Sequence, residues 1–492
     1  MPLTVSTICP SCGGGLEFEH GTNAVKCGFC GSSHVVTGHG RVLSYYITEK
    51  IVVNKAVSLA LVALRDKGLP GCKVREATLF FVPFYHFIGQ DFFWEMKKEV
   101  ISEAEELHEQ RSIFMAPVGG LDDGAFLDSL SGVGHGSPQL TEKRFEMDAR
   151  HIDRTLPAAD LPELGVFSLG LRPEVLKLSL FERKAVLERG QITPVKLPIA
   201  EVEERGYAPV RPDGIVFRRV FGKTRAVVYF PFWIVEVARP DGSGAVAVVD
   251  GVSGDVTNAD APLSILDRLV DRDGHEYATV GLRPLKCPDC GADLPVRPKD
   301  VVFFCDNCKK AWYIAGEELA QVSYSQAPPV NGQKDPLYLP FWVVEAGMRS
   351  GGQAVETKYD LSVIAPGLRL PSEADRKIPL RFFVPAFEMG NLGVLSRISS
   401  TFTKNQPVWQ DAVERAVPAK GGFISPDDAL EVAPVVLFSL IPKGNKKALK
   451  FALEATVEAK KAELVLVPFF KTQYDYVDGL FGLSLPAAAV KE

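Results

Sequence analysis

The sequence is organised around CPDCG at residues 287–291, CDNC at 305–308 and YLPFWVVE at 338–345. The same layout opens the chain, where CPSCG stands at residues 9–13 and CGFCG at 27–31. In both cysteine sets, 14 residues separate the second cysteine from the third. Two sets of equal spacing indicate that the chain uses one cysteine module twice.

A short Pro-Phe-aromatic motif recurs after the cysteine sets. Its copies are VPFY at 82–85, YFPFWIVE at 229–236, LPFW at 339–342 and VPFF at 467–470. Because alternate strand residues face opposite sides, Phe232 and Trp233 need cover on both faces of a sheet, unless a bulge turns one of them. We expect neighbouring layers to bury both faces; the alternative is an exposed aromatic row that receives a partner strand.

Length and composition describe an ordinary globular protein with several domains. The chain has 492 residues, 46% hydrophobic and 24% charged, which corresponds to about three or four domains. The predicted divisions are 1–40 (first zinc ribbon), 41–284 (β-rich domain with helical segments and a Gly-rich loop), 285–316 (second zinc ribbon) and 317–492 (C-terminal β-rich domain). The predicted fold class is α+β, internally repeated, with few helices.

The cysteine spacing predicts two structural zinc sites. The expected ligands are Cys9, Cys12, Cys27 and Cys30 at the first, and Cys287, Cys290, Cys305 and Cys308 at the second. Four thiolates suit tetrahedral Zn²⁺ and leave no open position for a substrate. Iron of the rubredoxin type and disulfides are the competing interpretations, and the absence of an export signal favours metal over disulfides.

Three further residues were weighed as ligands or reactive groups. Cys72 is the ninth cysteine and is expected to be a buried thiol that packs as a small hydrophobe. His34 and His39 lie close to Cys30 in sequence. Because four cysteines suffice for zinc, we expect both histidines on the surface.

No catalytic motif is complete. Gly222-Lys223-Thr224 resembles the end of a phosphate loop, but Phe217 stands where the earlier glycine is required. Neither HExxH nor GxSxG occurs. An enzyme with a site assembled between domains is therefore the least favoured class.

Charge argues against nucleic acid as the main partner. The formal net charge is −6, and between Cys9 and Cys30 the only charged residues are Glu17, Glu19 and Lys26. The second ribbon balances its basic and acidic residues. Neither ribbon has the basic surface that phosphate binding needs.

The apolar patterns predict further elements. Expected strands are 43–47, 77–94, 337–346, 382–387, 433–441 and 464–474; expected helices are 53–65, 97–110 and 409–417; and 119–140 is expected to be a mobile Gly-rich loop. Residues 449–459 alternate like a strand but are rich in helix-favouring Ala, Glu and Lys, and we favour the strand. Pro83 is expected at a strand start, an edge or a bulge.

The cysteine modules, the Leu69-Pro70-Gly71 segment, the Pro-Phe strands and VVDGVSGDV at 248–256 together resemble a family of bacterial zinc-ribbon proteins. These are often labelled as resembling the transcription-factor-IIB ribbon or primosomal helicases. The resemblance covers roughly residues 1–283 and, as a repeat, 285–346. It implies an adaptor near phage-shock-protein-like and stomatin/flotillin-type membrane scaffolds. Some relatives carry a C-terminal transmembrane helix; LPAAAVKE at 485–492 contains none.

The combined expectation is a non-enzymatic zinc-binding scaffold or adaptor that holds two Zn²⁺ and binds other proteins. The expected location is the cytoplasm, because neither a secretory signal nor a transmembrane segment is visible; the family resemblance implies, in addition, association with the periphery of the inner membrane. The alternative function is a nucleic-acid-binding zinc-ribbon protein.

Overall fold

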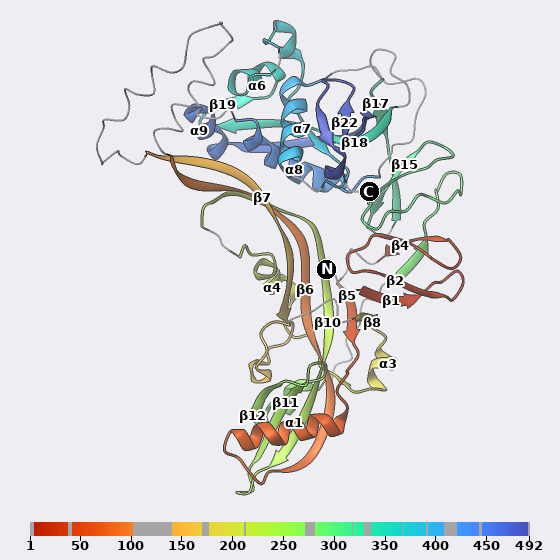
Figure 1. Cartoon of the computed structure of the whole chain (residues 1–492), viewed down its shortest axis with the longest axis vertical. Coiled ribbons are helices and arrows are strands. Elements are labelled where there is room, and N and C mark those ends of the chain that lie inside the picture. The colour runs from red at the N-terminus through yellow and green to blue at the C-terminus, as the bar shows by residue number, and fades with distance from the viewer. Residues whose placement is uncertain are drawn as a thin grey trace, which may run out of the picture.

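The computed structural model describes residues 4–37, 42–101, 140–169, 177–210, 213–270, 281–316, 318–328, 336–367, 369–389, 392–407, 421–441 and 445–490. These residues form two strand-rich lobes joined by a long stalk, with the two cysteine modules beside it (Figure 1). The expected mixture of strands with fewer helices is confirmed.

The N-terminal lobe is built on a sheet in which, among the described residues, ten strands pair. Seven follow the order β12-β11-β10-β5-β8-β1-β2; β6 also pairs with β10, and β7 and β9 pair with β6. Its strands are β1 (Thr4–Ile8), β2 (Gly15–Glu19), β5 (Leu43–Ile47), β6 (Lys73–Ile101), β7 (Leu140–Pro157), β8 (Lys177–Leu180), β9 (Gln191–Ile192), β10 (Ile215–Ala238), β11 (Gly244–Asp250) and β12 (Val256–Ala261). Its helices are α1 (Val53–Asp66), η2 (Pro162–Leu164), α3 (Arg183–Leu187), α4 (Ile199–Gly206) and α5 (Ile265–Leu269).

The C-terminal lobe has a second sheet of order β19-β18-β21-β22-β23, in which β17 adds to β21 and β20 adds to β18. Its strands are β17 (Tyr324–Gln326), β18 (Leu337–Ser350), β19 (Gln353–Val355), β20 (Arg381–Pro385), β21 (Thr456–Lys471), β22 (Asp475–Asp478) and β23 (Ser484–Pro486). Its helices are α6 (Lys358–Ile364), η3 (Glu373–Lys377), α7 (Leu392–Asn405), α8 (Pro426–Ser439), α9 (Lys446–Glu454) and η4 (Ala487–Ala489).

The stalk consists of β6, β7 and β10. β6 and β10 run from α1 at one end of the molecule to the C-terminal lobe, and β7 pairs with the half of β6 nearer that lobe (Figure 1). β6 has 29 residues, a length of roughly 95 Å at about 3.3 Å per residue. At its far end, the Trp94 indole N–H donates to the Val435 carbonyl of α8 at 2.9 Å. The Phe217 ring also lies 5.7 Å from the Phe438 ring. The stalk therefore packs directly on the C-terminal lobe.

The Pro-Phe prolines occupy equivalent places in their ladders. Pro83 falls between the segment of β6 that pairs with β9, ending at Phe81, and the segment that pairs with β7, starting at Phe84. In all four copies a backbone N–H donates to the proline carbonyl at this junction: Ala158 to Pro83 at 3.1 Å, Gly251 to Pro231 at 2.9 Å, Ala386 to Pro340 at 2.9 Å and Gly479 to Pro468 at 2.8 Å.

Pro83 lies inside β6 but at a local edge, which is one of the positions expected for it. It pairs with Tyr229 of β10 on one side only, because the pairing with β9 ends at Phe81 and the pairing with β7 starts at Phe84. On the side of β6 that faces away from β10, the paired strand changes from β9 to β7 at Pro83. The missing proline N–H therefore interrupts no continuous ladder of hydrogen bonds.

The aromatic residues of the motif are buried on both sides of the sheets, as expected. Phe341 and Trp342 are both 0% exposed, with no change of register between them. Phe84 and Tyr85 are buried as well, whereas Trp233 and Phe470 are partly buried.

Three aromatic residues of the motif each donate a side-chain hydrogen bond to a backbone carbonyl just before a helix. Trp342 donates to the Ile424 carbonyl at 2.8 Å, Trp233 to Ile51 at 2.7 Å, and Tyr85 to Leu197 at 2.7 Å. Each acceptor stands two residues before its helix, which is α8, α1 or α4 respectively.

Several expected elements are confirmed, including β5 at 43–47 and α1 over the segment 53–65. Three are wrong: 97–101 belongs to strand β6, 433–439 lies in helix α8, and 449–454 lies in helix α9 before β21 begins at Thr456. Residues 409–417 and 119–139 lie outside the described residues. No helix in the described part of the chain is both long and apolar enough to cross a membrane.

Candidate metal centres

Each cysteine pair lies on a tight turn between two strands. In the first turn, Gly13 donates its N–H to the Cys9 carbonyl at 2.8 Å, and Cys9 donates its own N–H to the Gly14 carbonyl at 2.8 Å. The residue after the second cysteine has a positive φ, 72° at Gly13 and 58° at Lys309. Glycine adopts this conformation without strain. Of the four turns, this one has Lys309 where the others have glycine. The Tyr324 hydroxyl donates to the Lys309 carbonyl at 2.7 Å and stabilises this conformation.

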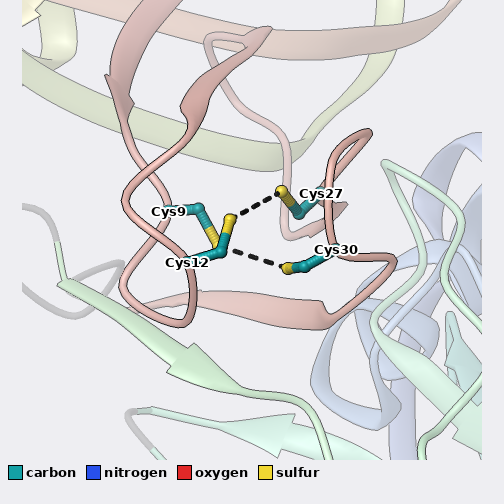
Figure 2. A group of neighbouring side chains, drawn as sticks. All are labelled: Cys9, Cys12, Cys27 and Cys30. Carbon is teal, nitrogen blue, oxygen red and sulfur yellow. Dashed lines mark hydrogen bonds between the residues drawn. The ribbon is translucent and has the colours of Figure 1, made fainter.

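The eight expected ligands converge into two groups within the described residues, Cys9, Cys12, Cys27 and Cys30 in one, and Cys287, Cys290, Cys305 and Cys308 in the other. In each group, all sulfur atoms lie within 4.8 Å of one another. Figure 2 shows the first group, where two turns face each other across the sulfur atoms.

The distances between the sulfur atoms match those around a tetrahedrally coordinated metal ion. In the first group the Cys9–Cys30 and Cys12–Cys27 Sγ atoms are 3.9 and 3.8 Å apart. In the second, the Cys287–Cys308 and Cys290–Cys305 distances are 3.6 and 3.5 Å. Four sulfurs placed about 2.3 Å from one Zn²⁺ lie roughly 3.8 Å apart. Both groups could therefore hold one metal ion.

Without a metal, the four thiols of a group would not ionise together. At Cys9 burial favours the thiol, but the backbone N–H groups of Ser11 and Cys12 prevail and lower its pKa to about 5. At Cys12 the Gly14 N–H favours the thiolate, yet the neighbouring sulfurs, Cys30 first, raise the pKa to about 12. A bound cation removes this mutual repulsion, so metal binding and full ionisation are coupled.

The second group shows the same division. The Ala292 backbone N–H and then the Asn307 side chain lower the pKa of Cys290 to about 6. Burial, followed by the neighbouring sulfurs, raises the pKa of Cys308 to about 12. In the first group the pKa of Cys30 is lowered as well, first by the Ser32 hydroxyl. Each group therefore has at least one sulfur that favours the thiolate and can capture a cation, and the sulfurs with a raised pKa ionise as the cation binds.

His34 was wrongly expected on the surface. It is 0% exposed, and its Nε2 lies 3.4 Å from Cys9 Sγ and 2.8 Å from Ser32 Oγ. Ser32 Oγ in turn lies 2.9 Å from Cys30 Sγ. The alternation of β4 turns His34 inward, towards the sulfur atoms. His39 lies outside the described residues.

The two modules share one small core and one strand. β13 (Gly281–Pro284), which leads into the second module, pairs with β4 (Ser33–Thr37) of the first, and β4 pairs with β3 (Ala24–Lys26). The second module has its own sheet, β14 (Val302–Phe304), β15 (Ala311–Ala315) and β16 (Glu318–Val322). Between the sheets lies a cluster of Ala24, Val35, Leu285, Cys287, Leu294, Phe303, Cys305 and Trp312.

Each module is also tied to a different lobe. Strand β1 of the first module pairs in parallel with β8 of the N-terminal lobe. In the second module, Val301 and Val302 donate their N–H groups to the Gly422 carbonyl, at 2.7 and 2.9 Å. The modules therefore form a continuous bridge between the lobes, beside the stalk.

A buried histidine pair lies where the first module meets the stalk. His20 and His86 stack with centroids 5.1 Å apart, and His86 Nε2 lies 2.8 Å from Asp153 Oδ1. This bond from His86 lowers the pKa of Asp153. No local pattern in the sequence indicates this contact, because the three residues are far apart along the chain.

The other candidate residues have structural explanations. Cys72 is partly buried and its thiol lies 3.4 Å from the Leu69 carbonyl. Gly222 and Lys223 lie at a bulge in β10, not at a strand-to-helix turn, so they do not form a phosphate loop. Beside this bulge is a cavity of about 500 Å³, at which Arg218 pairs with Asp91 at 2.7 Å and Arg219 with Glu431 at 3.2 Å.

Searches of protein-family models, curated proteins and solved structures found no match for this chain. The functional argument therefore depends on the geometry of the two metal centres and on their place between the lobes.

We expect the purified protein to contain two zinc ions per chain, because each cysteine group has the spacing of a tetrahedral site. Elemental analysis of protein purified without added metal measures this directly. One ion or none would contradict the expectation, and so would a red iron chromophore.

Proposed function

We propose that this protein is a non-enzymatic zinc-binding scaffold, in which the two metal modules fix the arrangement of two protein-binding lobes. The observation that carries the proposal is the position of the modules. One is hydrogen-bonded to the N-terminal lobe through β1, the other to the C-terminal lobe through Gly422, and the two share β4–β13 pairing.

The nature of the ligands supports a structural role for the metal. All four ligands at each centre are cysteine sulfurs, and a filled tetrahedron leaves no position for water or substrate. Zinc is the best match because it accepts four thiolates in a tetrahedron and has no redox chemistry. A closed centre of this kind contributes its binding energy to folding rather than to chemistry.

Repetition in both lobes is consistent with a scaffold built by duplication. In the N-terminal lobe Pro83 pairs with Tyr229, two residues before Pro231. In the C-terminal lobe Pro340 pairs with Leu466, two residues before Pro468. This shared register supports the proposal that each lobe contains two copies of one strand unit.

The proposed partners are other proteins, and the family resemblance places them at a membrane-stress or membrane-remodelling assembly. Affinity purification from cytosolic and membrane fractions, followed by mass spectrometry, tests this. We expect a set of proteins that survives nuclease treatment and is lost from a Cys12→Ser/Cys290→Ser double variant. A Cys72→Ser variant is the matched control, because Cys72 belongs to neither cysteine group, and it should retain the partners.

Two outcomes would overturn this proposal. Partners that disappear after nuclease treatment, together with salt-sensitive binding to DNA or RNA, would favour the nucleic-acid alternative. Unchanged partners in the double variant, after confirmed loss of both metal ions, would show that the modules do not organise the binding lobes.

A further inference from the structure

The two metal centres differ in the side chains that follow their last cysteine. Two and four residues after Cys30 stand Ser32 and His34, whereas Lys310 and Trp312 stand at the same places after Cys308. Lys310 turns away to Asp289, with Nζ 2.6 Å from Oδ1. Ser32 and His34 instead turn towards the sulfur atoms.

The direction of the hydrogen bonds at the first centre follows from the thiolates. A metal-bound thiolate accepts but does not donate, so the Ser32 hydroxyl donates to Cys30 Sγ across 2.9 Å. The Ser32 oxygen then accepts from His34 Nε2–H across 2.8 Å. Since His34 Nδ1 is buried without a hydrogen-bond partner among the described residues, the neutral Nε2–H tautomer fits this arrangement.

Cys12 and Cys30 form a natural pair for comparison. Both are exposed, while Cys9 and Cys27 are buried. Each exposed sulfur accepts a backbone N–H, from Gly14 at Cys12 and from Ser32 at Cys30. Of the two, only Cys30 also accepts a hydroxyl; the side-chain groups that act on Cys12 within the described residues are the other sulfurs, with Cys27 Sγ at 3.8 Å.

We propose that His34 and Ser32 form a donor chain that shields Cys30, and that Cys12 is the modification site at which electrophiles attack the first metal centre. This inference rests on the proposed metal binding. A hydrogen bond to a metal-bound thiolate withdraws electron density from sulfur and lowers its nucleophilicity. The buried cysteines are protected by lack of access, and Cys30 by its donor chain.

Limited alkylation with iodoacetamide tests the assignment. The Cys12 thiolate attacks the methylene carbon, an S–C bond forms, the C–I bond breaks, and iodide leaves with the bonding electrons. Mass spectrometry of peptides from the zinc-loaded full chain measures the modification of both cysteines in one sample. We expect Cys12 to react about tenfold faster than Cys30, the effect of one charge-assisted hydrogen bond.

Variants show whether the difference in alkylation rate between Cys12 and Cys30 comes from the donor chain or from solvent access alone. Ser32→Ala should bring the two rates to within about twofold of each other, and Ser32→Thr, which keeps the hydroxyl, should preserve the difference. His34→Phe should weaken the difference while leaving the Cys290 to Cys308 ratio unchanged. Equal rates in the wild-type protein would overturn the inference, as would a Ser32→Ala protein with an unchanged ratio.

The metal content of each sample distinguishes this inference from the proposed function. A wild-type chain that holds no metal contradicts the zinc scaffold itself. A chain that holds two zinc ions and alkylates Cys12 and Cys30 equally contradicts only the donor chain. If Ser32→Ala loses its metal, the His34→Phe protein decides the question: an unchanged ratio of Cys12 to Cys30 modification in that variant contradicts the donor chain.

Discussion

Replacing Trp342 with alanine is expected to lower the free energy of unfolding of the C-terminal lobe by about 3–5 kcal/mol. The indole is 0% exposed and lies in the strand pair between Val384 and Leu464. Truncation leaves a cavity in the largest cluster of the lobe. It also leaves the Ile424 carbonyl, just before α8, without the indole N–H that it now accepts.

Urea unfolding followed by circular dichroism measures this loss, and two matched variants divide it into parts. Trp342→Phe keeps an aromatic ring but removes the N–H donor, so we expect a smaller loss, about 1–3 kcal/mol. Phe470→Ala truncates the corresponding aromatic of another copy, which is only partly buried, and should cost less than Trp342→Ala. An unchanged unfolding midpoint in Trp342→Ala would show that this face receives a partner instead of forming core.

The Cys290→Ser protein is expected to lose one of its two metal ions together with the structure of the second module. Small structural zinc modules gain about 10–16 kcal/mol from the metal at neutral pH. Around the metal, the module's core is the small cluster that it shares with the first module, while Val302, Phe304 and Ala311 pack on the core of the C-terminal lobe. The two lobe sheets have separate cores and should remain folded.

Elemental analysis and hydrogen exchange together test this expectation. We expect one remaining metal ion, rapid exchange over residues 285–316, and weaker protection in β4, because β13 no longer holds its edge. Cys12→Ser gives the reciprocal pattern, and Cys72→Ser should retain both ions. Loss of all cooperative unfolding in Cys290→Ser would show that the lobes depend on the module for their stability.

The metal ligands were predictable because CxxC spacing encodes a local turn, and two such turns of equal spacing define a tetrahedral set. β5 and α1 were also predictable, since their apolar patterns are short and regular. The prediction of a strand at 433–441 was wrong because the apolar residues there do not follow one clear period. Helix α8 is apolar on nearly every side of its second half, so periodicity could not distinguish a buried helix from a buried strand.

Helix α9 and the inward position of His34 have local causes, whereas the Pro83 junction depends on residues that are distant in sequence. Residues 449–454 alternate like a strand, but Ala, Lys and Glu favour a helix, and Asn445 caps it by accepting the Ala448 N–H at 2.9 Å. The inward position of His34 depends on where the turn at Cys30 places β4. The Pro83 junction depends on two partner strands, β7 and β9, that no local pattern near Pro83 could indicate.

The bond between Asn23 and Lys299 joins residues that are 276 positions apart, and this separation has a consequence for synthesis. At about 5–20 residues per second, a ribosome needs roughly 14–55 s to make the chain between them. During that interval the first module has its four cysteines but lacks β13, so one edge of β4 stays open. The first centre can therefore take up its ion well before its neighbour exists, and the nascent chain must protect an unpaired strand edge until then.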